Sequence, residues 1–224
     1  EHLNPKVRRV LSTVKEYLPL MNDQQLIVMR STLFPGTMRI IHNMLEREGW
    51  KPKLAFCPER ILQGKGISEI FQLPQIVSGT GKQAEEEAVW LFSHIASKIL
   101  RVTPEEAELV KLMTNSWRYL EFAIANQFYM MANDQGIDFN HVFRAITTDY
   151  PRAKNFAHPG LSAGPCLFKD TMQLASYYNN NFFLGHAAML INEGLPNHLV
   201  LHLKRLMNGS LKNKKIAILG MTFK

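Results

Sequence analysis

The chain has 224 residues, of which 46% are hydrophobic and 20% are charged. This composition is typical of a protein with a packed core and excludes a disordered chain. The net charge of +7 favours anionic partners. The basic residues are scattered, apart from a short lysine-rich stretch at 212–215, and no docking motif for nucleic acid accompanies them. We therefore expect a phosphorylated metabolite as ligand and no nucleic acid, with a basic anion-binding protein as an alternative.

Other classes are excluded by what the sequence lacks. No apolar run approaches the roughly 18 residues that a membrane span needs, and the polar first residues carry neither a starting Met nor the apolar core of a signal peptide. We expect both ends to be cuts within a longer protein. Cys57 and Cys166 do not make a disulfide framework, so free thiols in a cytoplasmic protein are expected. Without a CxxC pair or an HExxH motif, no metal site is expected.

Apolar runs and helical patterns alternate over the first hundred residues. We expect helices over 7–18, 37–48 and 82–98, and strands over 26–29, 54–56, 75–79 and 99–102. This alternation is typical of an α/β layer built on a parallel sheet. No GxGxxG sequence follows a strand, so a Rossmann-type domain here would lack its first half.

From Thr103 onward the pattern is helical. Thr103 is expected as N-cap, Pro104 at N1 and Glu106 at N3, which together make a capping box. The helix should run for roughly 30 residues, to about Gln135, and stop at Gly136. Shorter helices are expected over 138–147, 166–180 and 184–207, and a strand over 215–220 is expected to open a third unit.

The sequence around Cys166 has the pattern of a catalytic thiol. A loop that carries Gly160 and Gly164 leads through Pro165 into a helix, and Cys166 lies in its first turn. The positive end of the helix dipole favours a thiolate there. Asp170 follows one turn later, and a thiolate beside a carboxylate suits covalent catalysis. A small buried Cys with Asp170 in solvent is the alternative.

Two further groups of residues indicate chemistry. Lys111, Asn115 and Arg118 share one stripe of the long helix, where Lys and Asn can stabilise an oxyanion; a solvated face is the alternative. Thr32 and Glu59 follow the ends of two expected strands, where α/β sheets bind ligands; turn chemistry is the alternative there. Cys57 is interpreted as a packing residue.

These motifs stand in an order that resembles the nucleotide-sugar 6-dehydrogenases, which include the UDP-glucose and UDP-N-acetylhexosamine dehydrogenases. The resemblance covers nearly the whole chain. The segments that carry it are 30–37, 57–60, 111–115, 118–119, 122–126, 164–170 and 219–224.

The resemblance implies an α/β fold class: a partial Rossmann-type parallel sheet, an all-α dimerisation domain with one long helix, and the first strand of a second Rossmann-like domain. The implied domains are residues 1–102, the C-terminal half of an NAD-binding domain; 103–210, a helical central domain; and 211–224, the start of a UDP-sugar-binding domain. NAD is the implied cofactor, a UDP-sugar the substrate, and a homodimer through the long helix the assembly. A chain without the Gly-rich NAD loop is expected to be inactive by itself.

The implied reaction oxidises the sugar C6 alcohol to the uronic acid by two hydride transfers, through a thiohemiacetal and a thioester on Cys166. Lys111 and Asn115 would stabilise oxyanions, and Asp170 would act in proton transfer with Lys111 and a water. Glu59 would assist thioester hydrolysis. The further implied roles are water positioning by Thr32, cofactor binding by Ser31, Thr32, Glu59 and Lys169, and substrate binding by Lys169, Phe168, Gly160, Gly164, Arg118, Phe223 and Lys224.

One position departs from the UDP-glucose members of that family. They often carry a second Glu four residues after the first, where this chain has Gln63. Gln63 cannot act as a base, and Arg118 is not general to that type, so the sugar stays open. Two alternatives to an active enzyme are a catalytically silent relative and a non-catalytic helical dimerisation fragment. The apolar residues Phe122, Ile124, Phe128 and Met131 of the long helix suggest the second.

Overall fold

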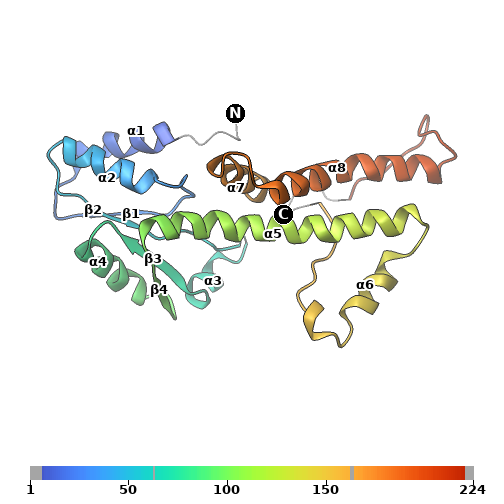
Figure 1. The fold of residues 1–224 in the computed structure, drawn as a ribbon, viewed down its shortest axis with the longest axis horizontal. Coiled ribbons are helices and arrows are strands. Elements are labelled where there is room, and N and C mark those ends of the chain that lie inside the picture. Colours follow the sequence, from blue (N-terminus) through green and yellow to red (C-terminus); the bar gives the residue numbers. More distant parts are fainter. Residues whose placement is uncertain (1–6, 63, 162–163, 220–224) are drawn as a thin grey trace. The chain divides into compact units, whose positions relative to one another are not determined.

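The computed structural model describes residues 7–62, 64–161 and 164–219 (Figure 1). By packing, the chain divides into two compact units, Glu1–Thr114 (unit 1) and Asn115–Lys224 (unit 2). The helix α5, Pro104–Asp134, contributes residues to both units. The units are described separately below.

Unit 1 is a four-stranded sheet between helices. Its strands lie in the order β1-β2-β3-β4, and helices α1 and α2 cover one face while α4 covers the other (Figure 1). The strands are β1 Leu26–Met29, β2 Lys53–Phe56, β3 Gln75–Gly79 and β4 Ile99–Arg101. The helices are α1 Val7–Tyr17, the 3-10 turn η1 Leu18–Leu20, α2 Thr37–Arg47, α3 Gly66–Gln72 and α4 Lys82–Ser93.

The two cores of unit 1 follow from the alternation of side chains along a strand. Leu54 and Phe56 of β2 pack with Ile41 of α2 on one face. Ala55, between them, packs with Phe92 of α4 on the other. β2, which is buried on both faces, reads as a continuous apolar run. Apolar runs located β1 to β4 within one or two residues.

The expectation of a parallel sheet was wrong for one pair of strands. β1 pairs with β2, and β3 with β4, in parallel, but β2 and β3 are antiparallel, with Ala55 opposite Gly79. A parallel crossover must carry the chain back across a face of the sheet. In its described residues, the segment between β2 and β3 contains only the seven-residue helix α3, and the chain re-enters the sheet at the edge it left. The exposed helix α3 was also absent from the sequence-based prediction, and α4 ends at Ser93, before the expected residue 98.

The long helix begins as the sequence predicts. The backbone N–H of Thr103 donates to Glu106 Oε2 at 2.7 Å, and the N–H of Glu106 donates to Thr103 Oγ1 at 3.2 Å, which completes the capping box. The helix ends at Asp134, and Gly136 follows with a φ of +69°, a conformation that glycine adopts without strain. The helix is 31 residues long, close to the predicted length.

Unit 2 is helical in its described residues. Besides the second part of α5 it contains α6 Phe139–Thr147, the 3-10 turn η2 Pro151–Ala153, α7 Gly164–Tyr177 and α8 Phe183–Leu206. Helix α8 runs beside α5 in the same direction (Figure 1), since Asn192 bonds to Tyr119 and Arg205 to Asp134. The core joins Tyr119 to residues of α7 and α8, among them Leu167 and Ala188.

The strand expected over 215–220 is not formed in the described residues. Residues 215–219 are irregular, and the side chain of Leu219 is 95% exposed. An apolar run becomes a strand only when a neighbouring strand takes up its backbone N–H and C=O groups, and no described segment pairs with this one. The described part of this segment therefore does not show the predicted third domain.

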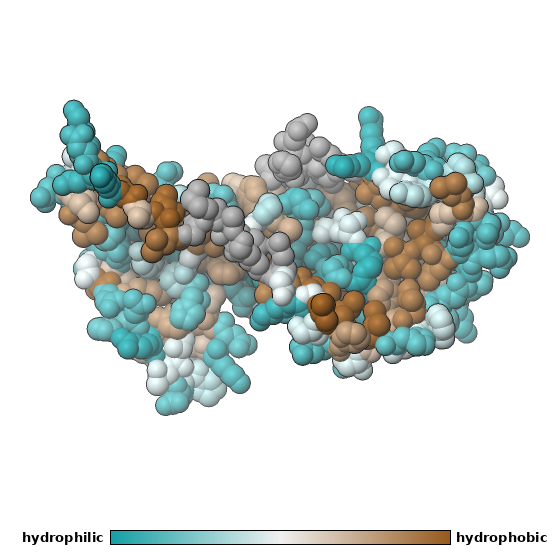
Figure 2. Space-filling view, turned by 180° about the vertical axis from the view of Figure 1, so that it is seen from behind, coloured by the Kyte–Doolittle hydropathy of each residue, from teal (hydrophilic) through white to brown (hydrophobic). Residues whose placement is uncertain are grey.

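The surface keeps some apolar character. Figure 2 shows hydrophobic residues gathered over the sheet-containing unit, on the face turned to the viewer. Large side chains such as Ile67, Phe71 and Trp90 are exposed in unit 1. Within the described ranges, no helix combines the length and the apolar character required to cross a membrane.

Gly79 at the end of β3 offers a test of packing. A Cβ at Gly79 would lie 2.4 Å from the backbone nitrogen of Glu85, whereas a Cβ at Gly81, two residues later, meets nothing within 4 Å. We expect Gly79→Ala to lower the free energy of unfolding by about 2 kcal/mol, because the start of α4 must shift. Gly81→Ala, the matched control, should change it by about 0.5 kcal/mol or less. Urea unfolding measures both; equal effects would refute this account.

Candidate active site

The first group of candidate residues lies where β1 and β2 end. Since these strands are parallel, their carboxyl ends meet at one edge of the sheet, and the chain continues there as Arg30 after β1 and as Glu59 after β2. The N–H of Glu59 donates to the carbonyl oxygen of Arg30 at 3.1 Å. The sequence placed candidate ligand-binding residues after two strands, and the structure brings the ends of these two strands together.

The carboxylate of Glu59 is held from two sides. Arg30 donates from its guanidinium to Glu59 Oε2 as an ion pair. The backbone N–H groups of Arg60 and Ile61 donate to Oε1 at 2.8 and 2.9 Å. Arg30 is itself oriented by the ring of Phe92, whose centroid lies 4.9 Å from the guanidinium carbon. The carboxylate thus has a fixed direction, which a base acting on a positioned water requires.

The same contacts decide the charge of Glu59. Partial burial raises the pKa of Glu59, but the hydrogen bond from Arg30, the N–H groups of Ile61 and Arg60 and the positive charge of Arg30 together lower the pKa below its ordinary value. The group is therefore ionised at neutral pH and can accept a proton.

Lys111 joins this group from α5. Its Nζ donates to the backbone carbonyl oxygen of Glu59 at 2.6 Å, so the amino group of Lys111 lies just beyond the carboxyl end of β2. Ser31 is exposed and Thr32 is half-buried beside it, at the end of β1. Within unit 1, the structure thus brings together Glu59 and Lys111, and Ser31 and Thr32 follow in the chain from Arg30, which is bonded to Glu59.

The second group lies in unit 2. Cys166 is the third residue of α7, and its thiol is exposed. Asp170, one turn later, is 1% exposed. Both observations contradict the alternative of a buried Cys beside a solvated Asp170. Exposure with a place in the first turn of a helix is the arrangement expected of a reactive thiol.

Asp170 is paired with the long helix. Asn115, itself buried, donates from Nδ2 to Asp170 Oδ2 at 2.6 Å. Lys169 lies with its Nζ 3.8 Å from Asp170 Oδ1. The alternative of a solvated helix face is therefore wrong for Asn115, while Arg118 on the same stripe is half-buried.

The remaining predicted residues have separate environments. Gly160 bonds through both its N–H and its C=O to Asn126. Gly164 opens α7 with a φ of +67°, and Phe168 packs against Tyr119, with ring centroids 6.2 Å apart. Gln63, Phe223 and Lys224 lie outside the described residues.

Cys57 is not a second reactive thiol. It is fully buried in the core between β2 and α4, where burial raises the pKa of the thiol to about 11. This confirms the interpretation of Cys57 as a packing residue.

Sequence reasoning gave no role to three polar residues that the structure makes prominent. Arg30 orients Glu59, Glu108 accepts from the backbone N–H groups of Gly36 and Met38, and Asn126 holds Gly160. Glu108 and Asn126 are fully buried on helix α5. A polar residue on an otherwise apolar helical stripe is the signal that could have found them, because such a residue must have a partner.

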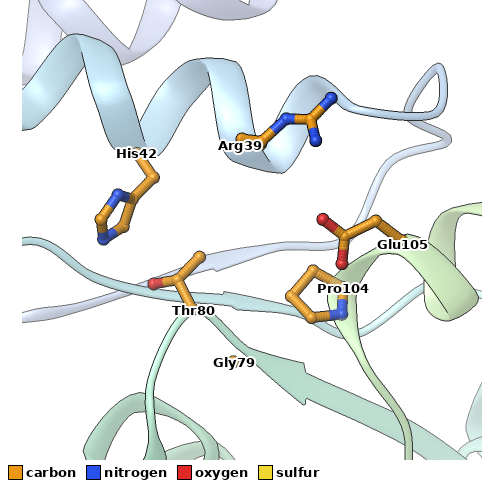
Figure 3. A pocket seen from close by; sticks show the side chains of 6 residues that line it. All are labelled: Arg39, His42, Gly79, Thr80, Pro104 and Glu105. Atoms are coloured by element: carbon orange, nitrogen blue, oxygen red, sulfur yellow. The ribbon is translucent and has the colours of Figure 1, made fainter.

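A hollow of about 260 Å³ in unit 1 contains none of these residues (Figure 3). It is lined from α2, the end of β3 and the start of α5 by Arg39, His42, Gly79, Thr80, Pro104 and Glu105. Because β3 is antiparallel to β2, its end lies at the opposite edge of the sheet from Glu59. Among the described residues, no group of three or more His, Cys, Asp or Glu could hold a metal ion.

Comparison with known proteins identifies relatives along the chain. Residues 1–96 match the NAD binding domain of the UDP-glucose/GDP-mannose dehydrogenase family, and residues 105–193 match its central domain. The match to the first of these domains confirms the expectation of NAD as the cofactor. The UDP-N-acetyl-D-mannosamine dehydrogenase of Methanococcus maripaludis is 32% identical over 221 residues, which is 96% of this chain and 50% of the relative. The UDP-glucose 6-dehydrogenase of Rickettsia bellii is 27% identical over 91% of this chain and 49% of its own.

The solved structures that this chain resembles include dehydrogenases of the same kind as these relatives. The UDP-N-acetyl-mannosamine dehydrogenase structure from Pyrococcus horikoshii has a TM-score of 0.83 at 27% identity, over 93% of this chain and 52% of the other. The corresponding enzyme from Staphylococcus aureus gives 0.83 at 25%, over 100% of this chain and 54% of the other. The chain spans about half the length of the curated relatives that it matches.

The pair of Arg30 and Glu59 predicts a pH-dependent stability. Because the pKa of Glu59 is lowered on folding, its stabilising effect is present above the ordinary pKa of 4.5 and is lost as the pH falls through the folded value. Arg30→Gln should lower the free energy of unfolding by about 1 kcal/mol at pH 7, a modest value because both side chains are about a third exposed. The difference from wild type should shrink towards pH 3 in urea unfolding.

The control is Lys15→Gln, which removes the exposed ion pair between Lys15 and Glu48. Its effect should stay below about 0.5 kcal/mol. A loss for Arg30→Gln that is the same at pH 7 and pH 3 would contradict the assigned role of Glu59.

Proposed function

The chain belongs to the UDP-glucose/GDP-mannose dehydrogenase family, and we propose that the full natural protein oxidises the C6 alcohol of a UDP-sugar to the uronic acid with NAD. The observation that carries this proposal is the exposed thiol of Cys166 in the first turn of α7, with the buried pair of Asn115 and Asp170 one turn behind it.

The residues at the ends of β1 and β2 fit a nicotinamide cofactor. Open α/β sheets bind dinucleotides beyond the carboxyl ends of their parallel strands, and Ser31 and Thr32 offer hydroxyl groups there, next to Glu59. We assign cofactor contacts to these three residues and to Lys169. When bound, NAD accepts the hydride that leaves C6 in each oxidation.

Cys166 divides the four-electron oxidation into steps that share one carbon. Loss of a hydride and a proton converts the alcohol to the aldehyde, and Sγ of Cys166 then adds to the aldehyde carbon to give a thiohemiacetal. Loss of a second hydride and of the hydroxyl proton gives a thioester, and water cleaves the C–S bond to release the uronic acid and the thiol. The covalent bond holds the intermediate in place between the two oxidations.

Charge on the substrate oxygen is the second requirement. Each addition to the carbon at C6 places negative charge on an oxygen, and a fixed ammonium or amide group stabilises it. We assign this role to Lys111 and Asn115, which project one turn apart from α5. Asp170 would exchange protons with Lys111 through a water.

Hydrolysis of the thioester needs an ionised base. Glu59 has this property, since its pKa lies below the ordinary value. Its fixed carboxylate supports the proposal that Glu59 activates the hydrolytic water and that Thr32 positions it.

The sugar is proposed only as a class. The relatives named above act on UDP-N-acetyl-D-mannosamine or UDP-glucose. We assign contacts with the nucleotide sugar to Lys169 and Phe168 of α7, to Gly160 and Gly164 before them, and to Arg118, Phe223 and Lys224. A diphosphate requires cations, which the lysines supply.

A homodimer is proposed for the assembly. Large apolar side chains project from α5 into solvent at helical spacing: Trp117 is 61% exposed and Met131 58%, with Ile124 and Phe128 exposed between them. An apolar stripe along a helix packs against a second helix in water. This observation also supports the second candidate function, a helical dimerisation module without catalysis.

Replacement of the proposed nucleophile tests the mechanism. In the full natural protein, Cys166→Ser and Cys166→Ala should lower uronic acid formation by on the order of 1,000-fold or more, because neither side chain forms the thioester. Product is measured by mass spectrometry. Cys57→Ser is the matched control. Because Cys57 has no role in the proposed reaction, this variant should keep normal turnover when it is folded. Normal turnover by the Cys166 variants would refute the proposed mechanism.

A panel of substrates tests the class of sugar. UDP-glucose, UDP-N-acetylglucosamine and UDP-N-acetylmannosamine are supplied in parallel with NAD. We expect one of them to give NADH in a ratio of two per sugar consumed, since both oxidations occur at one carbon. A ratio of one would contradict the two-step oxidation, and no reaction with any sugar would favour the catalytically silent relative.

The apolar stripe predicts the state of association. Trp117→Glu with Ile124→Glu should convert a dimer into a monomer at micromolar concentration in sedimentation velocity, because a buried unpaired carboxylate opposes the contact. Glu86→Gln on α4, outside the stripe, is the control and should leave the dimer intact. A wild-type monomer at that concentration would refute the proposed assembly.

A further inference from the structure

The side-chain amide of Asn126, on α5, is fully buried, and its hydrogen bonds are made to other residues of unit 2. Its Oδ1 accepts from the N–H of Gly160 at 2.7 Å, and its Nδ2 donates to the C=O of Gly160 at 3.0 Å. Nδ2 also donates to Asn192 Oδ1 at 2.9 Å. Gly160 thus receives the pair of hydrogen bonds that a neighbouring strand would give it.

The partners of Asn126 are fixed in turn. Asn192, on α8, is 3% exposed and donates from Nδ2 to the backbone carbonyl oxygen of Tyr119 at 3.0 Å. Tyr119 is fully buried, and its hydroxyl group donates to Glu193 Oε1 at 2.9 Å. Each amide has one orientation that satisfies its neighbours, so Asn126 cannot turn without leaving buried groups unpaired.

Cys166 lies between two such attachments to one helix. Gly160, six residues before it, is held by Asn126, and Asp170, four residues after it, is held by Asn115. Asn115 and Asn126 are eleven residues apart, about three turns, so they share one face of α5. One described position on each side of the thiol, Gly160 before it and Asp170 after it, is therefore held by the same helix.

We propose that Asn126 is a positioning residue for Cys166: by holding both backbone groups of Gly160, it sets where the thiol lies when it adds to the substrate. The proposal rests on the proposed function of Cys166. Asn126 itself takes no part in the chemistry. A purely structural amide would stabilise unit 2 and leave the chemistry of the folded protein unchanged.

The test uses Asn126→Asp in the full natural protein. The introduced side chain keeps the oxygen that accepts from Gly160 N–H. Its second oxygen donates to Gly160 C=O only while the group is a neutral carboxylic acid, a form that burial favours. As the carboxyl ionises, that bond becomes a repulsion between two oxygens. The single O–H of the acid cannot also donate to Asn192 Oδ1, so that bond is lost at every pH and only the bond to Gly160 C=O changes with pH. Turnover relative to wild type should therefore be highest at the lowest pH at which the protein is folded, and should fall on the order of 10- to 100-fold from there as the pH rises.

A second readout does not depend on catalysis. The rate at which iodoacetamide alkylates Cys166 is measured by peptide mass over the same pH range, with buried Cys57 counted in the same digest. The rate relative to wild type should be nearest to one at low pH and should depart further from one as the pH rises. Asn126→Leu, which cannot make either bond to Gly160, should give at all pH values the departure that Asn126→Asp gives at high pH.

The matched control is Asn133→Asp, on the same helix two turns later, where the amide bonds to His198 of α8 at 3.3 Å. Its relative turnover and relative alkylation should not vary with pH. The proposal is overturned if relative alkylation in folded Asn126→Asp is as flat with pH as in the control. If alkylation varies with pH while turnover does not, the positioning role stands and the proposed function of Cys166 fails, so the two failures are distinct.

Discussion

Buried polar groups on one helix organise much of this protein. Helix α5 carries the buried side chains of Glu108, Asn115 and Asn126, and a buried donor or acceptor left unpaired costs about 1–3 kcal/mol. Each therefore demands a partner from another segment: the N-terminus of α2 for Glu108, α7 for Asn115, and Gly160 for Asn126. Buried apolar residues of the same helix, such as Leu112 and Tyr119, pack against the cores, while the polar residues determine which segments pack where. A long helix made only of leucine would give packing without these specific attachments.

The environment of each carboxylate gives it a different character. Glu59 has an arginine and two backbone amides, and its pKa falls. Burial raises the pKa of Glu108, although the N–H groups of Met38 and Gly36 partly offset this. Glutamate is thus a charged group at the edge of the sheet in the case of Glu59, and a group that caps the start of α2 in the case of Glu108. The difference arises from neighbours that are 29 and 70 residues away in the chain, so composition alone does not predict it.

Local signals located β1 to β4, the long helix and part of the site, but they missed α3 and placed a strand over 215–220 that the described residues do not form. The capping box of Thr103 and Glu106, the stop at Gly136 and the apolar runs of the strands depend on neighbours a few residues away, and those predictions were confirmed. The antiparallel return into β3 depends on where a seven-residue helix delivers the chain, which no local pattern encodes. The place of Cys166 at the start of α7 was predictable from its loop. The pair of hydrogen bonds between Asn126 and Gly160 was not predictable, because Asn126 lies 34 residues before Gly160.

The contrast between the two thiols has a consequence for the protein under oxidising conditions. A peroxide must reach sulfur to form a sulfenic acid, and Cys57 is sealed in the core while Cys166 is open to solvent. Oxidative damage to cysteine would therefore begin at one atom, at the surface, and would leave the packing of the sheet untouched. A preparation aged in air would stay folded while it lost the free thiol of Cys166. The fraction of Cys166 thiol recovered on addition of a thiol reductant would then show how much of the sulfur had stopped at the reversible sulfenic acid stage.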